Sequence, residues 1–167
     1  IDIIEDQQFL GLKDQRVALV VNHTSINSRN KHIVDIFYQN GINVKKIFSP
    51  EHGLKGNYGA GVENINDSTH YNIEVISLYG KKTKPSTSDL KDIDLIIFDI
   101  QDIGVRFYTY ISTMTLAMEA AAENNVDFLI LDRSNPNSIL GVSGPTLSKK
   151  FKSYVGMHQI PIIYDLT

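Results

Sequence analysis

Short apolar runs alternate along the chain with stretches whose apolar residues recur at helical spacing. Runs of this length, rich in Val, Ile, Leu and Phe, are typical of parallel strands that are buried on both faces. The expected strands occupy residues 17–21, 44–48, 73–79, 94–100, 128–131 and, as a sixth, 160–164.

Helical patterns fill three of the intervals between these runs. The residues that set the spacing are Ile33, Ile36 and Phe37 in the first helix, and Phe107, Tyr110, Ile111, Met114, Met118, Ala121 and Ala122 in the third. Gly41 follows the first pattern, at the position of a C-terminal cap. A short second helix is expected to open after Pro85, with Thr87 or Ser88 as its N-cap. It should end near Asp92.

This order of elements predicts an α/β fold. The fold would be a Rossmann-like open, mostly parallel sheet with helices on both faces and right-handed crossovers. A length of 167 residues suits a single domain, which we expect to span residues 1–167. A long loop over residues 49–71 joins two of the strands, and loops of this length are usually functional or disordered.

Polar residues follow the carboxyl end of each of the first five expected strands, the edge where ligands bind in such sheets. They are Asn22, His23 and Thr24; Ser49, Pro50, Glu51 and His52; Tyr79 and Gly80; Asp99, Gln101, Asp102 and Arg106; and Asp132, Arg133 and Asn135. Five polar strand ends are more than the solvation of loops requires. The pattern therefore predicts a convergent polar site.

Glu51 is the strongest candidate within this set, because Pro50 stiffens the chain before it and Gly53 frees the chain after it. Asp99, at the end of a buried strand, also suits a helix cap or an ion-pair partner. His52 equally suits a hydrogen bond within a turn.

The aromatic stripe that begins the third helix is expected to pack mainly into the core, as Phe107, Tyr110 and Met114 recur at helical spacing. Tyr108 lies on the other face of that pattern. It is therefore more available to a ligand.

Composition narrows the class of function. The net charge is −3 and the basic residues are scattered, which argues against nucleic acid as a partner. The absence of cysteine excludes disulfides and thiolate chemistry. No apolar run approaches the roughly 20 residues of a membrane span, and residues 1–6 carry acid rather than the basic start of a signal peptide. The five histidines show no metal-ligand spacing, so neither a metal nor another cofactor is expected.

Several sequence blocks resemble those of the NamZ-type exo-β-N-acetylmuramidases, formerly a family of unknown function. The blocks are residues 20–24 (VVNHT), 49–54 (SPEHGL), 77–80 (SLYG), 98–114 (FDIQDIGVRFYTYISTM) and 131–136 (LDRSNP). The blocks occur in order, and the resemblance as a whole extends from about residue 12 to residue 163. The 98–114 block is long and chemically unusual, which makes a chance match improbable.

The resemblance implies a Rossmann-like catalytic domain followed by a smaller C-terminal domain, with the cleft between them. It implies a glycosidase that releases N-acetylmuramic acid from the non-reducing ends of peptidoglycan fragments. Export from the cytoplasm is then expected, because peptidoglycan lies outside the cytoplasmic membrane.

Carried over by position, the resemblance makes Glu51 the best candidate for the catalytic acid. The residues expected to line the sugar site are Asn22, Thr24, His52, Tyr79, Asp99, Gln101, Asp102, Arg106, Tyr108 and Asn135. We expect Arg106 to bind the lactyl carboxylate of muramic acid, because a guanidinium can grip a carboxylate through two hydrogen bonds.

Glycoside hydrolysis normally requires two carboxyl groups, one of them protonated. Asp99, Asp102 and Glu63 are in range by topology as the second group, and a C-terminal domain could supply another. Their separation would distinguish retention from inversion of the sugar.

Two departures from the family pattern affect the expected activity. The chain stops at Thr167, where family members continue, and Tyr164 and Asp165 stand where a His-Gly pair is usual. A non-catalytic sugar-binding module is therefore the second interpretation. A third is a phosphoryl-transfer enzyme that holds Mg²⁺ on Asp99 and Asp102.

Overall fold

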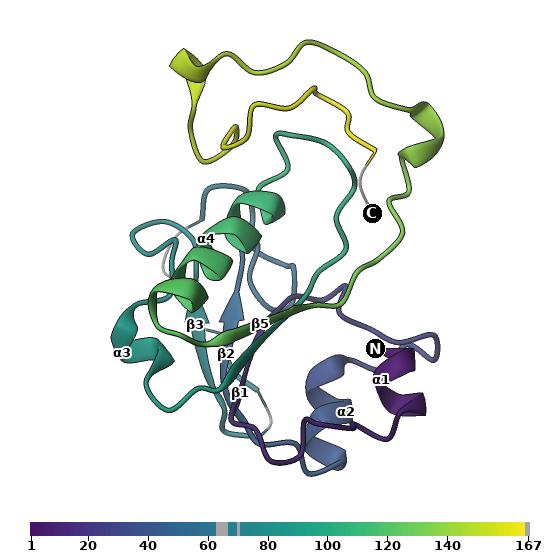
Figure 1. Cartoon of the computed structure of the whole chain (residues 1–167), viewed down its shortest axis with the longest axis vertical. Helices are drawn as coiled ribbons and strands as arrows, with labels where there is room; N and C mark the ends of the chain where they lie inside the picture. Colours follow the sequence, from purple (N-terminus) through teal and green to yellow (C-terminus); the bar gives the residue numbers. More distant parts are fainter. Residues whose placement is uncertain (63–66, 70, 166–167) are drawn as a thin grey trace.

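A five-stranded parallel sheet forms the centre of the computed structural model, which describes residues 1–62, 67–69 and 71–165 (Figure 1). Its strands are β1 (Val17–Val21), β2 (Val44–Ser49), β3 (Glu74–Ser77), β4 (Leu95–Asp99) and β5 (Asp127–Ile130). They lie in the order β3-β2-β1-β4-β5, and each neighbouring pair is parallel. The predicted α/β class is confirmed. The strand order reverses between β1 and β4, which places a ligand crevice at their carboxyl ends.

Helices cover both faces of this sheet (Figure 1). On one face lie α1 (Asp2–Asp6) and α2 (Ile33–Gln39), and on the other α3 (Thr87–Leu90) and α4 (Tyr110–Glu123). Strand β1 supplies both cores, because successive side chains of a strand point to opposite faces. Leu19 packs in the core under α2, whereas Ala18 and Val20 pack in the core under α4.

Two helix ends show how local chemistry sets the boundaries. Gly41 has φ +71° just beyond α2, as expected for the residue after a C-cap. The predicted N-cap of α3 was wrong, because Ser86 takes that position instead of Thr87 or Ser88. Ser86 is the N-cap because Asp89, three residues further on, completes a capping box with it. The hydroxyl of Ser86 accepts from the Asp89 N–H, and the Asp89 carboxylate accepts from the Ser86 N–H at 2.7 Å.

The predicted sixth strand is absent from residues 160–164 in the described chain. Ile163 instead makes isolated antiparallel bridges to Val105 and Ser143. Pro161 has no N–H to donate to a strand ladder. The carbonyls on either side of it accept hydrogen bonds from Arg106, so these residues bind a loop rather than the sheet.

The predicted start of the third helix was too early. Helix α4 begins at Tyr110, so Phe107 lies in the preceding turn with 59% of its surface exposed. Met118 is also exposed, at 42%, whereas Tyr110 is buried as expected. The expectation that Phe107 packs into the core is therefore wrong.

Residues 141–165 form a mostly irregular C-terminal segment beyond the carboxyl end of the sheet (Figure 1). Hydrogen bonds from Tyr164 N to Gly104 O and from the Ser112 hydroxyl to Tyr154 O join it to the loop before α4 and to α4 itself. Gly104 has φ +67°, and a Cβ there would lie 2.2 Å from the Asn135 amide nitrogen, so only glycine fits. Among the described residues, no helix has the length and apolarity needed to cross a lipid bilayer.

Candidate active site

The carboxylate of Glu51 is held at the carboxyl end of β2 by one donor on each oxygen. Oε2 accepts from the Thr109 hydroxyl at 2.8 Å, and Oε1 accepts from the Gly61 N–H at 3.2 Å. Glu51 is 8% exposed. Each carboxylate oxygen can accept more than one hydrogen bond, so the group can still bind another partner.

Thr109 places this carboxylate at the N-terminus of α4. It is the N-cap residue of the helix, yet its side chain makes no capping hydrogen bond. Its hydroxyl donates to Glu51 instead. The hydrogen bond therefore places the carboxyl group of Glu51 beside the first turn of α4.

The turn that carries Glu51 is fixed by its neighbours. Gly53 N donates to Pro50 O at 3.0 Å, and both His52 and Gly53 have positive φ, at +71° and +76°. The His52 ring forms a 2.8 Å hydrogen bond between Nδ1 and the Tyr58 carbonyl. Because a carbonyl can only accept, Nδ1 donates this hydrogen bond. A role for His52 in binding sugar stays a prediction.

Two tyrosines, Tyr110 and Tyr154, lie close enough to Glu51 for its charge to raise the pKa of their hydroxyl groups. Burial raises the pKa of Tyr110, with smaller contributions from Tyr108 and from the charge of Glu51. Burial also raises the pKa of Tyr154, whose hydroxyl lies 2.8 Å from Thr113 Oγ1, and the charge of Glu51 contributes there too. Both hydroxyls therefore keep their protons at neutral pH.

Two further aromatic contacts extend the cluster. The rings of Tyr79 and Tyr154 lie 6.0 Å apart, and Tyr108 meets Tyr110 edge-on at 4.8 Å. Tyr79 and Tyr108 were both predicted site residues. The structure places them in contact with Tyr154 and Tyr110, the two tyrosines whose pKa is raised in part by the charge of Glu51.

The crevice between β1 and β4 is lined by residues that bond to one another. Asn22 Oδ1 accepts from the N–H of Thr24 at 2.9 Å and from its hydroxyl at 2.6 Å. The hydroxyl of Thr24 accepts from Gln101 N at 3.0 Å, and Gln101 Nε2 donates to the carbonyls of Asp102 and Ser134. Within the described chain, the buried Nδ2 of Asn22 has no hydrogen-bond partner. These side chains hold the two loops together.

Asp99 forms a buried ion pair with Arg133. Its carboxylate accepts from Arg133 Nε at 2.6 Å and from Nη2 at 3.0 Å, and its side chain is fully buried. Burial raises the pKa of Asp99, and the guanidinium opposes that rise. This is the ion-pair alternative that the sequence left open.

The same contacts weigh against a Mg²⁺ site on Asp99 and Asp102, because both oxygens of Asp99 already accept from Arg133. Across the described ranges, no group of three or more His, Asp or Glu side chains is arranged to hold a metal ion. Phosphoryl transfer through a metal at this strand end thus has no support from the geometry.

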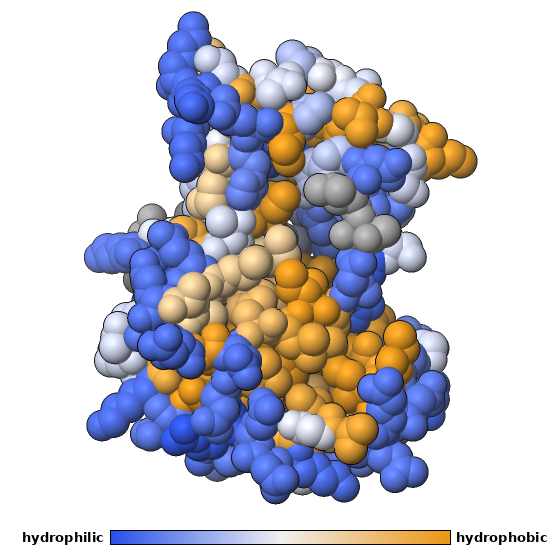
Figure 2. Space-filling model, in the orientation of Figure 1, coloured by the Kyte–Doolittle hydropathy of each residue, from blue (hydrophilic) through white to orange (hydrophobic). Residues whose placement is uncertain are grey.

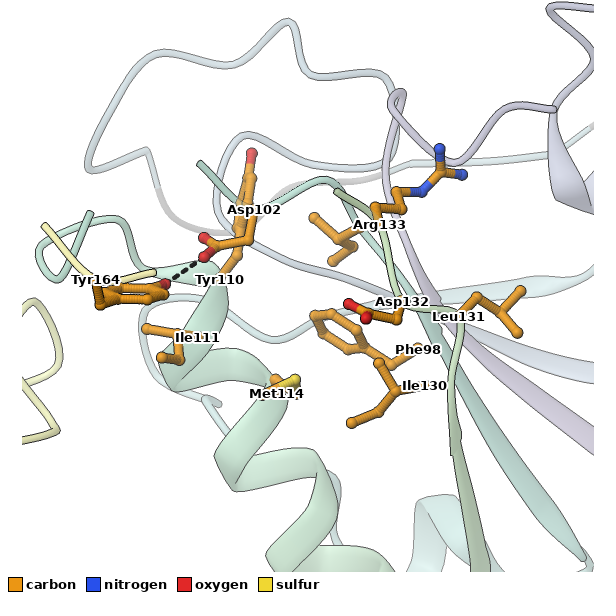
Figure 3. A pocket seen from close by; sticks show the side chains of 11 residues that line it. Phe98, Asp102, Tyr110, Ile111, Met114, Ile130, Leu131, Asp132, Arg133 and Tyr164 are labelled. Atoms are coloured by element: carbon orange, nitrogen blue, oxygen red, sulfur yellow. Dashed lines mark hydrogen bonds between the residues drawn. The ribbon is translucent and has the colours of Figure 1, made fainter. Parts of the chain in front are cut away.

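A pocket of about 360 Å³ opens between β4, β5 and the start of α4 (Figure 3). It is lined by Phe98, Ile100, Asp102, Tyr110, Ile111, Met114, Ile130, Leu131, Asp132, Arg133 and Tyr164. Glu51 is not part of this lining. Tyr110 is part of it, and the charge of Glu51 contributes to the raised pKa of Tyr110.

Asp102 lies in the wall of this pocket. Its Oδ2 accepts from the hydroxyl of Tyr164 (Figure 3). The same oxygen accepts from Gly104 N at 3.2 Å. Burial and the bond to Asp102 raise the pKa of Tyr164. Among the described residues, the buried Oδ1 of Asp102 has no hydrogen-bond partner.

Arg106 and Asn135 hold the C-terminal segment. Arg106 Nη1 donates to Pro145 O at 2.7 Å and to Ile160 O at 2.6 Å. Asn135 Nδ2 donates to Tyr164 O at 2.9 Å. Sugar-binding roles for these two residues stay predictions, and Glu63, the other carboxyl candidate, lies outside the described residues.

Two residues of this site, Thr109 and Tyr154, were not among the candidates predicted from the sequence, and the role of a third, Arg133, was not predicted. Thr109 lies inside the 98–114 block, and that block was the available signal for it. Arg133 was noted as polar, but nothing in the sequence identified Asp99 as its partner. Tyr154 lies in a stretch with no periodic pattern, so no signal pointed to it.

Comparison with known proteins places these features in a wider group. Residues 17–167 match the family described as "Exo-beta-N-acetylmuramidase NamZ, N-terminal". The peptidoglycan beta-N-acetylmuramidase NamZ of Bacillus subtilis (strain 168) is 44% identical over 160 residues, which covers 93% of this chain and 38% of that protein.

Two crystal structures of DUF1343 family proteins from Bacteroides fragilis NCTC 9343 resemble the fold. Their TM-scores are 0.89 and 0.80, with 41% and 42% sequence identity. They cover 99% and 96% of this chain, but the chain covers 42% and 41% of theirs. The chain thus spans about two fifths of the length of these relatives.

Proposed function

The chain belongs to the exo-beta-N-acetylmuramidase NamZ family, and from this membership we propose that the protein containing it is a glycosidase acting on peptidoglycan. It would release N-acetylmuramic acid from the non-reducing ends of peptidoglycan fragments. The match over residues 17–167 carries the proposal, and it includes Glu51 with both of its hydrogen-bond donors.

Glu51 is the proposed general acid. In this role its carboxyl group donates a proton to the oxygen of the leaving sugar as the glycosidic bond breaks. Thr109 and Gly61 fix the direction of the carboxyl group. Asp102 is the second carboxyl group that we favour, because Asp99 is engaged with Arg133 and Asp102 keeps a buried oxygen without a partner.

Arg106 is proposed to select muramic acid through its lactyl carboxylate. The side chain also holds two carbonyls of the C-terminal segment through Nη1, so it would join substrate binding to the order of that segment. We further propose that residues 1–167 form one Rossmann-like domain and that a smaller second domain completes the cleft. Because peptidoglycan lies outside the cytoplasmic membrane, the proposed location is extracytoplasmic, as a secreted, periplasmic or cell-surface protein.

The test is hydrolysis of 4-nitrophenyl β-N-acetylmuramide beside the corresponding glucosaminide, with the full-length protein and with the 167-residue chain. We expect turnover of the muramide and little of the glucosaminide by the full-length protein, and weak or no turnover by the chain alone. Binding of a muramyl ligand without turnover in the full-length protein would instead support a sugar-binding module.

Replacing Thr109 with Val should lower kcat on the muramide by about 10-fold, with little change in KM. The loss follows because this hydrogen bond fixes the direction of the reacting carboxyl group, and the roughly 1.4 kcal/mol that one hydrogen bond can contribute corresponds to a factor of about 10 in rate. Thr109→Ser keeps the hydroxyl and should retain most of the activity.

Thr115→Val is the matched control for this variant. It removes a hydroxyl from the same helix that bonds to Ile111 O and to His158, without contact to Glu51. Equal kcat in Thr109→Val and Thr115→Val would show that the hydroxyl of Thr109 does not position the acid.

A further inference from the structure

Tyr164, near the end of the C-terminal segment, is only 5% exposed and is held through both of its main-chain groups. Its N–H donates to Gly104 O at 3.0 Å, and its carbonyl accepts from Asn135 Nδ2 at 2.9 Å. These two hydrogen bonds fix the residue beside Asp102, and its hydroxyl donates to Asp102 Oδ2 (Figure 3). The direction of the phenol is therefore set by the loop before α4 and by the loop after β5.

Asp102 is held at several points as well. Its Oδ2 accepts from Gly104 N at 3.2 Å in addition to the Tyr164 hydroxyl, and its main-chain carbonyl accepts from Gln101 Nε2 at 2.8 Å. Its Oδ1 is buried and has no hydrogen-bond partner within the part of the chain that the structure describes. One oxygen of this carboxyl group is therefore occupied, and the other is left for a ligand.

The rest of the pocket wall around this pair is mostly apolar. Phe98 lines it from β4, and Ile111 and Met114 line it from α4. Figure 2 shows an apolar area over α4 and β5, the elements on either side of the pocket. A buried polar group without a hydrogen bond costs free energy, above all in apolar surroundings. An unpartnered carboxylate oxygen in such a place is typical of a group that receives a ligand or takes part in catalysis.

The hydroxyl of Tyr164 is a permanent donor at neutral pH. Burial raises the pKa of Tyr164, and the bond to Asp102 raises it further, so the phenol keeps its proton. Tyr164 stands where a His is usual in the family, and a His side chain changes its charge between about pH 5 and 8. A donor that does not titrate near neutral pH is therefore a feature of this chain.

We propose that Tyr164 is a positioning residue, whose hydroxyl holds Oδ2 of Asp102 so that Oδ1 stays available to the reaction. This inference rests on the proposed function, in which Asp102 is the second carboxyl group. Without the hydroxyl, Oδ2 keeps only the 3.2 Å contact to Gly104 N, and the carboxyl group becomes free to rotate. Misplacement of a reacting group lowers the rate of the chemical step, so the effect of Tyr164 should appear in kcat.

Tyr164→Phe in the full-length protein removes the hydroxyl and keeps the ring. On 4-nitrophenyl β-N-acetylmuramide we expect kcat to fall about 10-fold, while KM changes by less than about 2-fold. Tyr71→Phe is the matched control, because the Tyr71 hydroxyl also donates to an aspartate, Asp35 of α2, at 2.8 Å. The control should keep the kcat of the wild type. An unchanged kcat in Tyr164→Phe would overturn the proposal.

A double variant shows whether Tyr164 acts through Asp102. If the hydroxyl only orients this carboxyl group, Tyr164→Phe should lower the residual kcat of Asp102→Asn by less than about 2-fold. An equal loss in the wild-type and Asp102→Asn backgrounds would overturn the proposal, because Tyr164 would then act independently of Asp102.

The activity of the wild type separates this proposal from the proposed function. A full-length wild type without turnover of the muramide would refute the proposed function and this inference together. Normal turnover by the wild type, combined with either adverse result for Tyr164→Phe, would overturn the role of Tyr164 alone.

Discussion

Glu51→Gln is expected to lower kcat on a muramyl glycoside by a factor of about 10² to 10⁴, the range typical of a lost general acid. The substitution can preserve both hydrogen bonds of the Glu51 side chain. The new amide can donate its NH₂ group to the Thr109 hydroxyl, which can also accept, while its oxygen accepts from Gly61 N–H. The fold and KM should therefore change little.

Michaelis kinetics and a thermal unfolding curve, measured on the full-length variant, check this expectation. Glu119→Gln serves as the control, because Glu119 lies on the exposed side of α4 with only a surface contact to Lys84. If Glu51→Gln keeps the kcat of the wild type, Glu51 is not a catalytic residue.

The second large effect is expected on stability, from Arg133→Met. This change leaves the fully buried carboxylate of Asp99 without its cation, and breaking a buried ion pair costs about 3–5 kcal/mol. The loss should appear in urea unfolding followed by circular dichroism.

A double variant distinguishes the ion pair from simple packing. Asp99→Asn combined with Arg133→Met leaves neither charge buried, so it should recover a substantial part of the lost stability. A double variant as unstable as the sum of the two single variants would show that the pair itself contributes little.

The centre of the sheet could be predicted because β1 and β4 are buried on both faces. The residues of β1 and β4 are all apolar up to their carboxyl ends, so no other element fits them. The 160–164 run is also five residues long and apolar, yet Pro161 lacks an N–H and Arg106 donates hydrogen bonds to the carbonyls of Ile160 and Ile162, which keeps the run out of the sheet. Composition alone does not show that these carbonyls bind Arg106 rather than a neighbouring strand.

The site was predictable in part for a related reason. Carboxyl ends of parallel strands meet at one edge, which brought Asn22, Glu51 and Asp99 into one group from sequence alone. The partner of each acid lies far away along the chain. Thr109 is 58 residues from Glu51, and Arg133 is 34 residues from Asp99. Only the folded structure therefore shows that Glu51 accepts a hydrogen bond from a hydroxyl and that Asp99 forms an ion pair.

The family resemblance is confirmed by the match over residues 17–167 and by the two related crystal structures. It supplied the substrate class, which no feature of the composition indicates. The structure adds the physical content: a carboxyl group with two donors at a helix N-terminus, beside tyrosines that keep their protons.

The most direct test of Glu51 as a general acid compares two leaving groups in Glu51→Ala. A sugar alcohol leaves poorly without a proton, whereas 4-nitrophenolate leaves readily without one. We predict that the variant loses far more activity on a muramyl disaccharide than on 4-nitrophenyl β-N-acetylmuramide. Equal losses on the two substrates would contradict the role of Glu51 as the acid that protonates the leaving group.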